Sequence, residues 1–76
     1  MEDLRQNAGP AERLLGYRTS IGLSVAKLAK QLRTSASHLS EIERGKRRPG
    51  LPVAVRIRDL VGIGVDDWLQ GEDHAA

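Results

Sequence analysis

Residues 24–45 have the sequence SVAKLAKQLRTSASHLSEIERG, and this stretch predicts two short helices joined by a turn. Over residues 25–32 the apolar side chains recur at spacings of three and four, which places them on one face of a helix. Ser24 and Ser35 precede the two helices, and a serine hydroxyl at such an N-cap position accepts a hydrogen bond from a free backbone N–H of the first turn. The stretch therefore predicts helices over 25–32 and 36–44.

The same local signals predict three further helices around this pair. Pro10 opens a helix over 10–21, because the N–H that proline lacks would have no partner inside the helix. Residues 51–61 and 65–69 are expected to be helical as well, with Asp66 as the cap of the last one. No stretch alternates apolar and polar residues as a strand does, so the sequence predicts an all-α fold of five short helices.

The two ends of the chain lie outside these helices. Residues 1–9 hold only three apolar side chains and residues 70–76 show no pattern, so we expect a flexible acidic N-terminal arm and a flexible C-terminal tail. Residues 10–69 then form one compact domain. A chain of 76 residues buries only about 60–65% of the surface that its unfolded form exposes, so the core is modest.

The composition excludes several classes of protein. The chain has no Cys, which rules out a disulfide framework and thiolate metal sites or nucleophiles. No apolar run approaches the roughly 18 residues of a membrane span, and the first residues, MEDLRQ, are acidic where a signal peptide is basic. We therefore expect a cytoplasmic protein without a membrane partner.

The net charge of +2 conceals an uneven distribution along the chain. From Arg13 to Arg58 there are eleven Lys and Arg residues and two acids, a local charge of +9, whereas the two flanks together carry one base and eight acids, a local charge of −7. A basic middle between acidic ends indicates an anionic partner for the middle of the chain.

The polar helix over 36–44 is the candidate DNA-recognition helix. Two helices about three residues apart have helix-turn-helix geometry, in which the second enters the DNA major groove, about 12 Å wide. Small side chains at its start, Ala36 and Ser37, let the backbone approach the base edges. Gly45 ends this helix, and the basic stretch 46–49 that follows directly is favoured as a contact to the DNA backbone over a merely solvated charge run.

A specific set of residues connects the region from Arg18 to Leu69 with a known family. These residues are Arg18, Gly22, Leu23, Ser24, Leu28, Ala29, Leu32, Ser35, Leu39, Ser40, Ile42, Glu43, Arg44, Gly45, Lys46, Pro49 and Leu51. On them the chain resembles the Xre family of helix-turn-helix DNA-binding domains, which includes phage Cro and repressor proteins and the controller proteins of restriction-modification systems. The resemblance implies a compact five-helix fold like that of lambda repressor.

The resemblance also implies roles for individual side chains. The residues expected to contact bases are Ala36, Ser37, His38 and Glu41. The residues expected to contact phosphates are Lys27, Ser40, Arg44, Lys46, Arg47 and Arg48. Arg18 and Glu43 are expected to form a structural ion pair, and Val65, Trp68 and Leu69 a dimer contact, with closure of the core by Trp68 and Leu69 as the alternative. Glu41 is suited to accept a hydrogen bond from cytosine N4, whereas its charge would repel phosphate.

Three residues depart from the family pattern. Val25 stands where relatives usually have a Gln that touches a phosphate, so we expect that contact either to be absent or to move to Lys27 or Lys30. Arg33 replaces the usual turn glycine, and a left-handed backbone there costs about 1 kcal/mol. Arg58 occupies a position that is usually a small buried Ala, so that either this helix is rotated or the Arg58 side chain extends to solvent.

Sequence-specific binding to double-stranded DNA is the leading hypothesis for function. The protein is expected to be a homodimeric transcriptional regulator, most simply a repressor or autoregulator, on a palindromic operator. An antitoxin that neutralises a protein partner and represses its own operon is the alternative, although only residues 1–9 and 70–76 are available to wrap such a partner. With two His and no spaced cluster of His and carboxylates, neither an enzyme, a metal site nor a cofactor is expected.

Overall fold

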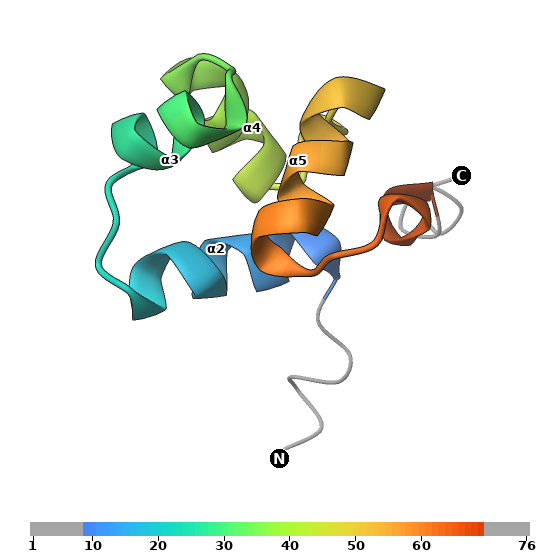
Figure 1. The fold of residues 1–76 in the computed structure, drawn as a ribbon, viewed down its shortest axis with the longest axis horizontal. Coiled ribbons are helices and arrows are strands. Elements are labelled where there is room, and N and C mark those ends of the chain that lie inside the picture. Colours follow the sequence, from blue (N-terminus) through green and yellow to red (C-terminus); the bar gives the residue numbers. More distant parts are fainter. Residues whose placement is uncertain (1–8, 70–76) are drawn as a thin grey trace.

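The computed structural model describes residues 9–69, and every regular element in that range is helical. The elements are α2 (Pro10–Ser20), α3 (Val25–Leu32), α4 (Ala36–Glu43) and α5 (Leu51–Val61), followed by a short helical segment over 65–69. In Figure 1, α2 lies along the base of the molecule, with α3, α4 and α5 above it. The predicted all-α, five-helix fold is confirmed, whereas the expected arm and tail lie almost entirely outside the described residues.

The core is aliphatic, as a chain with one Trp and no Phe requires. It forms where α3 packs on α4, α4 on α2 and α3 on α5. The buried apolar side chains are Leu14, Leu28, Ala29, Leu32, Leu39, Ile42, Ala54, Ile57, Ile63 and Trp68. Full burial of one Leu or Ile contributes about 1.5–3 kcal/mol, so the two central helices α3 and α4 are fixed to each other mainly by these contacts.

Three successive helices end with the same hydrogen-bond pattern. After α2, α3 and α4 the chain passes through a left-handed residue, Gly22 (φ 69°), Arg33 (φ 60°) and Gly45 (φ 76°). In each case the N–H of the following residue donates to the carbonyl five positions back, at 2.9–3.0 Å, which is the Schellman motif. Arg33 thus adopts the strained backbone that its position at a glycine site predicts.

Two local predictions about helix ends are wrong. The first helix was expected to include Ile21, but α2 stops at Ser20 and the Ile21 side chain is 53% exposed. Asp66 was expected to cap the last helix, but the carboxylate that does so belongs to Asp67, whose Oδ2 accepts the Gly64 N–H at 3.1 Å. Both depend on the exact residue at which the chain leaves or enters the helix, which varies by one or two positions.

The position of Arg58 is also settled. The buried face of α5 is formed by Ala54 and Ile57, while the Arg58 side chain is 52% exposed and pairs with Asp59 at 3.1 Å. Arg58 therefore reaches solvent and does not enter the core.

Trp68, the only tryptophan, closes the core from the segment 65–69. It is 5% exposed, and its indole Nε1 is buried without a hydrogen-bond partner. None of the helices in residues 9–69 has the length and apolar character that crossing a bilayer requires.

Candidate nucleic-acid interface

The turn between α3 and α4 is fixed by hydrogen bonds at both of its ends. Ser24 Oγ accepts the Lys27 N–H at 3.1 Å at the start of α3, and Ser35 Oγ accepts the His38 N–H at 3.0 Å at the start of α4. Between the helices, the Thr34 N–H donates to the Ala29 carbonyl at 2.9 Å. Each serine cap contributes about 1 kcal/mol, so the angle between α3 and α4 is well determined.

Helix α4 has one buried and one accessible face. Leu39, Ile42 and Glu43 face the core. On the other side Ala36 and Ser37 are exposed, and His38, Ser40 and Glu41 are half-buried. The exposed start of α4 carries no bulky side chain, so it can approach the base edges of a major groove closely.

Arg18 and Glu43 anchor α4 to α2. Arg18 Nε donates to Glu43 Oε2 at 2.8 Å and Nη2 donates to Oε1 at 3.1 Å, while Nη1 donates to the Leu23 carbonyl at 3.0 Å. The two side chains are only 16% and 5% exposed. The two residues expected to pair are therefore hydrogen-bonded to each other, and both side chains are largely shielded from solvent.

A second ion pair lies at the accessible end of α4. Arg47 Nε donates to Glu41 Oε1 at 2.7 Å, across six residues that include the end of the helix and Gly45. The hydrogen bond from Arg47, then its charge, lower the pKa of Glu41, with smaller contributions from Arg44 and His38. An exposed pair of this kind contributes about 0–1 kcal/mol, so it orients the two side chains more than it stabilises the fold.

The loop after α4 carries the strongest local positive charge. Arg44, Lys46, Arg47 and Arg48 are all exposed, while Pro49 is buried and holds the loop against the domain. Of these, Arg44 and Lys46 form no ion pair within residues 9–69, so their charges are available to a polyanion. The six predicted phosphate contacts thus lie on α3, on α4 and in this loop.

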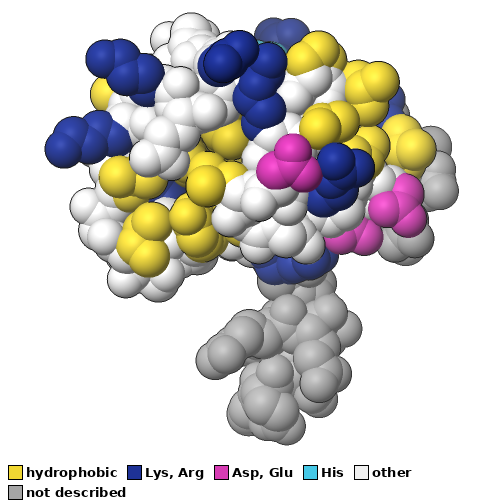
Figure 2. All heavy atoms as spheres, in the orientation of Figure 1, with side chains coloured by type: hydrophobic (Ala, Val, Ile, Leu, Met, Phe, Trp, Pro, Cys, Tyr) yellow, Lys and Arg dark blue, Asp and Glu magenta, His cyan; other side chains and the backbone are white. Residues whose placement is uncertain are grey.

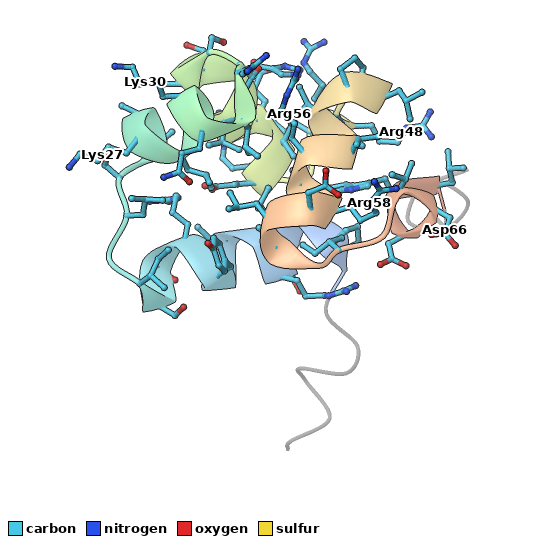
Figure 3. All side chains as sticks on the ribbon, viewed as in Figure 1. Lys27, Lys30, Arg48, Arg56, Arg58 and Asp66 are labelled. Atoms are coloured by element: carbon cyan, nitrogen blue, oxygen red, sulfur yellow. The ribbon has the colours of Figure 1, made fainter. Side chains whose placement is uncertain are left out.

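Helix α3 also contributes cations to this surface. Lys27 and Lys30 extend from α3 into solvent in Figure 3, and Figure 2 shows Lys and Arg side chains along the edge of the molecule formed by α3 and α4. The Asp and Glu side chains seen in the same view lie below that edge. The cations along this edge give the α3–α4 side a positive potential, which favours approach of an anionic ligand.

Arg56 is a cation for which the sequence did not predict a contact with DNA. It belongs to α5, is half-buried and, in Figure 3, extends upward from α5 toward the level of Lys30. The only signal in the sequence is a charged residue between two apolar ones, Val55 and Ile57, which equally fits a solvated position. Its direction depends on how α5 is rotated against α3, and that is a property of the packed domain.

The three expected dimer residues differ in accessibility. Leu69 is 54% exposed, Val65 is half-buried, and Trp68 belongs to the core. Leu69 and Val65 line a shallow hollow of about 360 Å³ together with Leu51, which is 65% exposed. The apolar surface in this region is therefore shared between the start of α5 and the segment 65–69.

These features agree with the comparison to known families. The model of the helix-turn-helix domain family matches residues 2–69, and the chain belongs to this family. Membership indicates DNA binding and a role in transcription regulation, and such domains are typically not enzymes. Comparison with curated proteins found no significant match, and neither did comparison with solved structures.

Proposed function

We propose that the protein is a sequence-specific, Xre-type regulator that binds double-stranded DNA with α4 in the major groove. The observation that carries this proposal is the accessible face of α4, where small side chains at the start of the helix are flanked by exposed cations of α3 and of the loop after α4. The small side chains permit contact with base edges, and the cations supply sequence-independent affinity through phosphate contacts.

The functional unit that we propose is a homodimer. One chain presents a single recognition helix, which reads only one half-site, and two-fold symmetric proteins read half-sites about 34 Å apart on one face of the duplex. Two accessible leucines support an apolar contact between chains, Leu51 and Leu69, which line the hollow described above. A dimer bound over a promoter blocks polymerase, so repression, including that of its own gene, is the proposed outcome.

A titration against DNA tests this function. Fluorescence anisotropy with a library of palindromic duplexes, at two salt concentrations, is expected to give one preferred sequence and a steep loss of affinity with salt. Ser37→Glu is expected to abolish specific binding, because it puts a bulky anion at the exposed start of α4. Thr19→Glu, on an exposed face of α2, is the matched control. Uniform weak binding, or equal effects of the two variants, would contradict the proposal.

The proposed dimer is tested by a separate measurement of the oligomeric state. Sedimentation equilibrium is expected to give a dimer for the wild type and a monomer for Leu69→Glu, since a charge in an apolar contact is destabilising. Ile21→Glu, at a similarly exposed apolar position at the end of α2, is expected to remain dimeric. A wild-type monomer even on operator DNA would contradict the proposed assembly.

A further inference from the structure

The ion pair between Glu41 and Arg47 lies where two different DNA contacts were expected. Glu41 is one helical turn beyond Ser37 on the accessible face of α4, and Arg47 comes from the loop that follows. The resemblance assigns Glu41 to a base and Arg47 to a phosphate. In the structure the two side chains are joined at 2.7 Å, so they reach DNA as one unit.

The hydrogen-bond capacity of Arg47 is only partly used. A guanidinium has five N–H donors in a planar fork, and Glu41 takes the one on Nε. Within residues 9–69 the two Nη groups of Arg47 have no partner, and the side chain is 57% exposed. The remaining donors are those that contact the O6 and N7 acceptors of guanine in a bidentate arrangement.

The charge of the pair favours a base over a phosphate. The Glu41 carboxylate cancels the positive charge of Arg47 locally, and the pKa of Glu41 is lowered chiefly by Arg47, so the carboxylate stays ionised near neutral pH. A neutral pair gains little from a phosphate and brings a carboxylate close to it. The guanine edge carries no net charge and offers two acceptors at the spacing of the guanidinium fork.

We propose that Arg47 is a specificity-determining residue that reads guanine in the major groove, and that Glu41 is its positioning residue. This inference rests on the proposed function and deepens it, because it assigns a base to a particular side chain. It also replaces two earlier expectations, a direct contact of Glu41 with cytosine N4 and a phosphate contact of Arg47.

The experiment compares single-base variants of the preferred duplex for the wild type, Arg47→Lys, Glu41→Ala and the control Arg48→Lys. Arg47→Lys keeps the charge and loses the planar fork. It is expected to lose about 5- to 150-fold of the preference for guanine at one position per half-site, with affinity for unrelated DNA and its salt dependence unchanged. Arg48→Lys is expected to keep every base preference.

Glu41→Ala distinguishes a positioning residue from a direct contact. It is expected to relax the preference at the same base pair as Arg47→Lys, and to bind unrelated DNA more tightly because a carboxylate is removed. The double variant is expected to lose no more preference there than Arg47→Lys alone. Because both positions are accessible, thermal unfolding followed by circular dichroism is expected to show all variants folded.

Two outcomes overturn the inference and leave the proposed function intact. One is a wild type with a preferred sequence whose base preferences all survive Arg47→Lys. The other is loss of preference in Glu41→Ala at a base pair that Arg47→Lys does not affect, which restores the direct contact to cytosine. A wild type without any preferred sequence overturns the proposed function itself and the guanine contact with it.

Discussion

Arg18 on α2 and Glu43 on α4 are joined by two parallel hydrogen bonds, of 2.8 and 3.1 Å, and are the most deeply buried ion pair in residues 9–69. The bidentate arrangement fixes the distance and the rotation of α4 relative to α2. Because the outer face of the same helix carries Ser37 and Glu41, the pair controls the direction in which the candidate base contacts point.

Glu43→Gln is expected to destabilise the domain by about 3–5 kcal/mol, because it leaves the Arg18 charge buried without its counter-charge. The total stability of a chain of this length is roughly 4–11 kcal/mol, so the variant loses between about a quarter and all of it. Urea denaturation followed by circular dichroism measures the change. The double variant Arg18→Met/Glu43→Leu, which removes both charges, is expected to recover most of the loss, and equal instability of single and double variants would contradict a structural role.

Arg33→Gly is expected to stabilise the domain by about 1 kcal/mol, because glycine adopts the left-handed conformation of this residue without a steric penalty. The midpoint of thermal unfolding is expected to rise by roughly 4–8 °C. Arg33→Ala removes the same charge and keeps the strain, so it serves as the control and should not raise the midpoint. An equal increase of the unfolding midpoint in both variants would show that the effect comes from removing the charge of Arg33.

The lowered pKa of Glu41 makes its ion pair sensitive to acid. Since the pKa of this group is depressed in the folded state, the stability that it contributes is present above its ordinary pKa and is lost as pH falls through the lowered value. Titration of the Glu41 carboxyl carbon by NMR is expected to show a midpoint below that of an ordinary Glu, and Arg47→Ala should move it upward. Arg48→Ala is the matched control, and an unchanged midpoint in Arg47→Ala would contradict the pairing.

Lys27→Gln and Lys46→Gln are expected to weaken binding to all DNA sequences alike. Each lost phosphate contact reduces the slope of log affinity against log salt by about 0.9 per subunit that makes it. Arg58→Gln removes the same charge from a residue that pairs with Asp59, and it is expected to leave the slope unchanged. A uniform decrease in all three variants would indicate a general effect of net charge.

The sequence predicted those parts of the fold that depend on local chemistry. Single residues mark the helix ends, namely the N-caps Ser24 and Ser35 and the glycines that end α2 and α4. The predicted helix bounds therefore agree with the observed ones to within one or two residues. The contact between Arg47 and Glu41 could not be predicted, since it depends on how the loop turns back after Gly45. The direction of the Arg56 side chain could not be predicted either, because it follows from the packing of α5 and not from the neighbouring residues in the sequence.

The buried indole of Trp68 provides the protein with an internal optical reporter. As the only tryptophan, it accounts for essentially all long-wavelength protein emission, and an indole without a hydrogen bond to Nε1 emits at shorter wavelength than one in water. Trp68 also lines a second surface hollow, different from the one beside Leu51, together with Arg44, Lys46 and Arg47. Its fluorescence is therefore expected to report on the integrity of the core and on the surroundings of the basic loop in one measurement, without any attached dye.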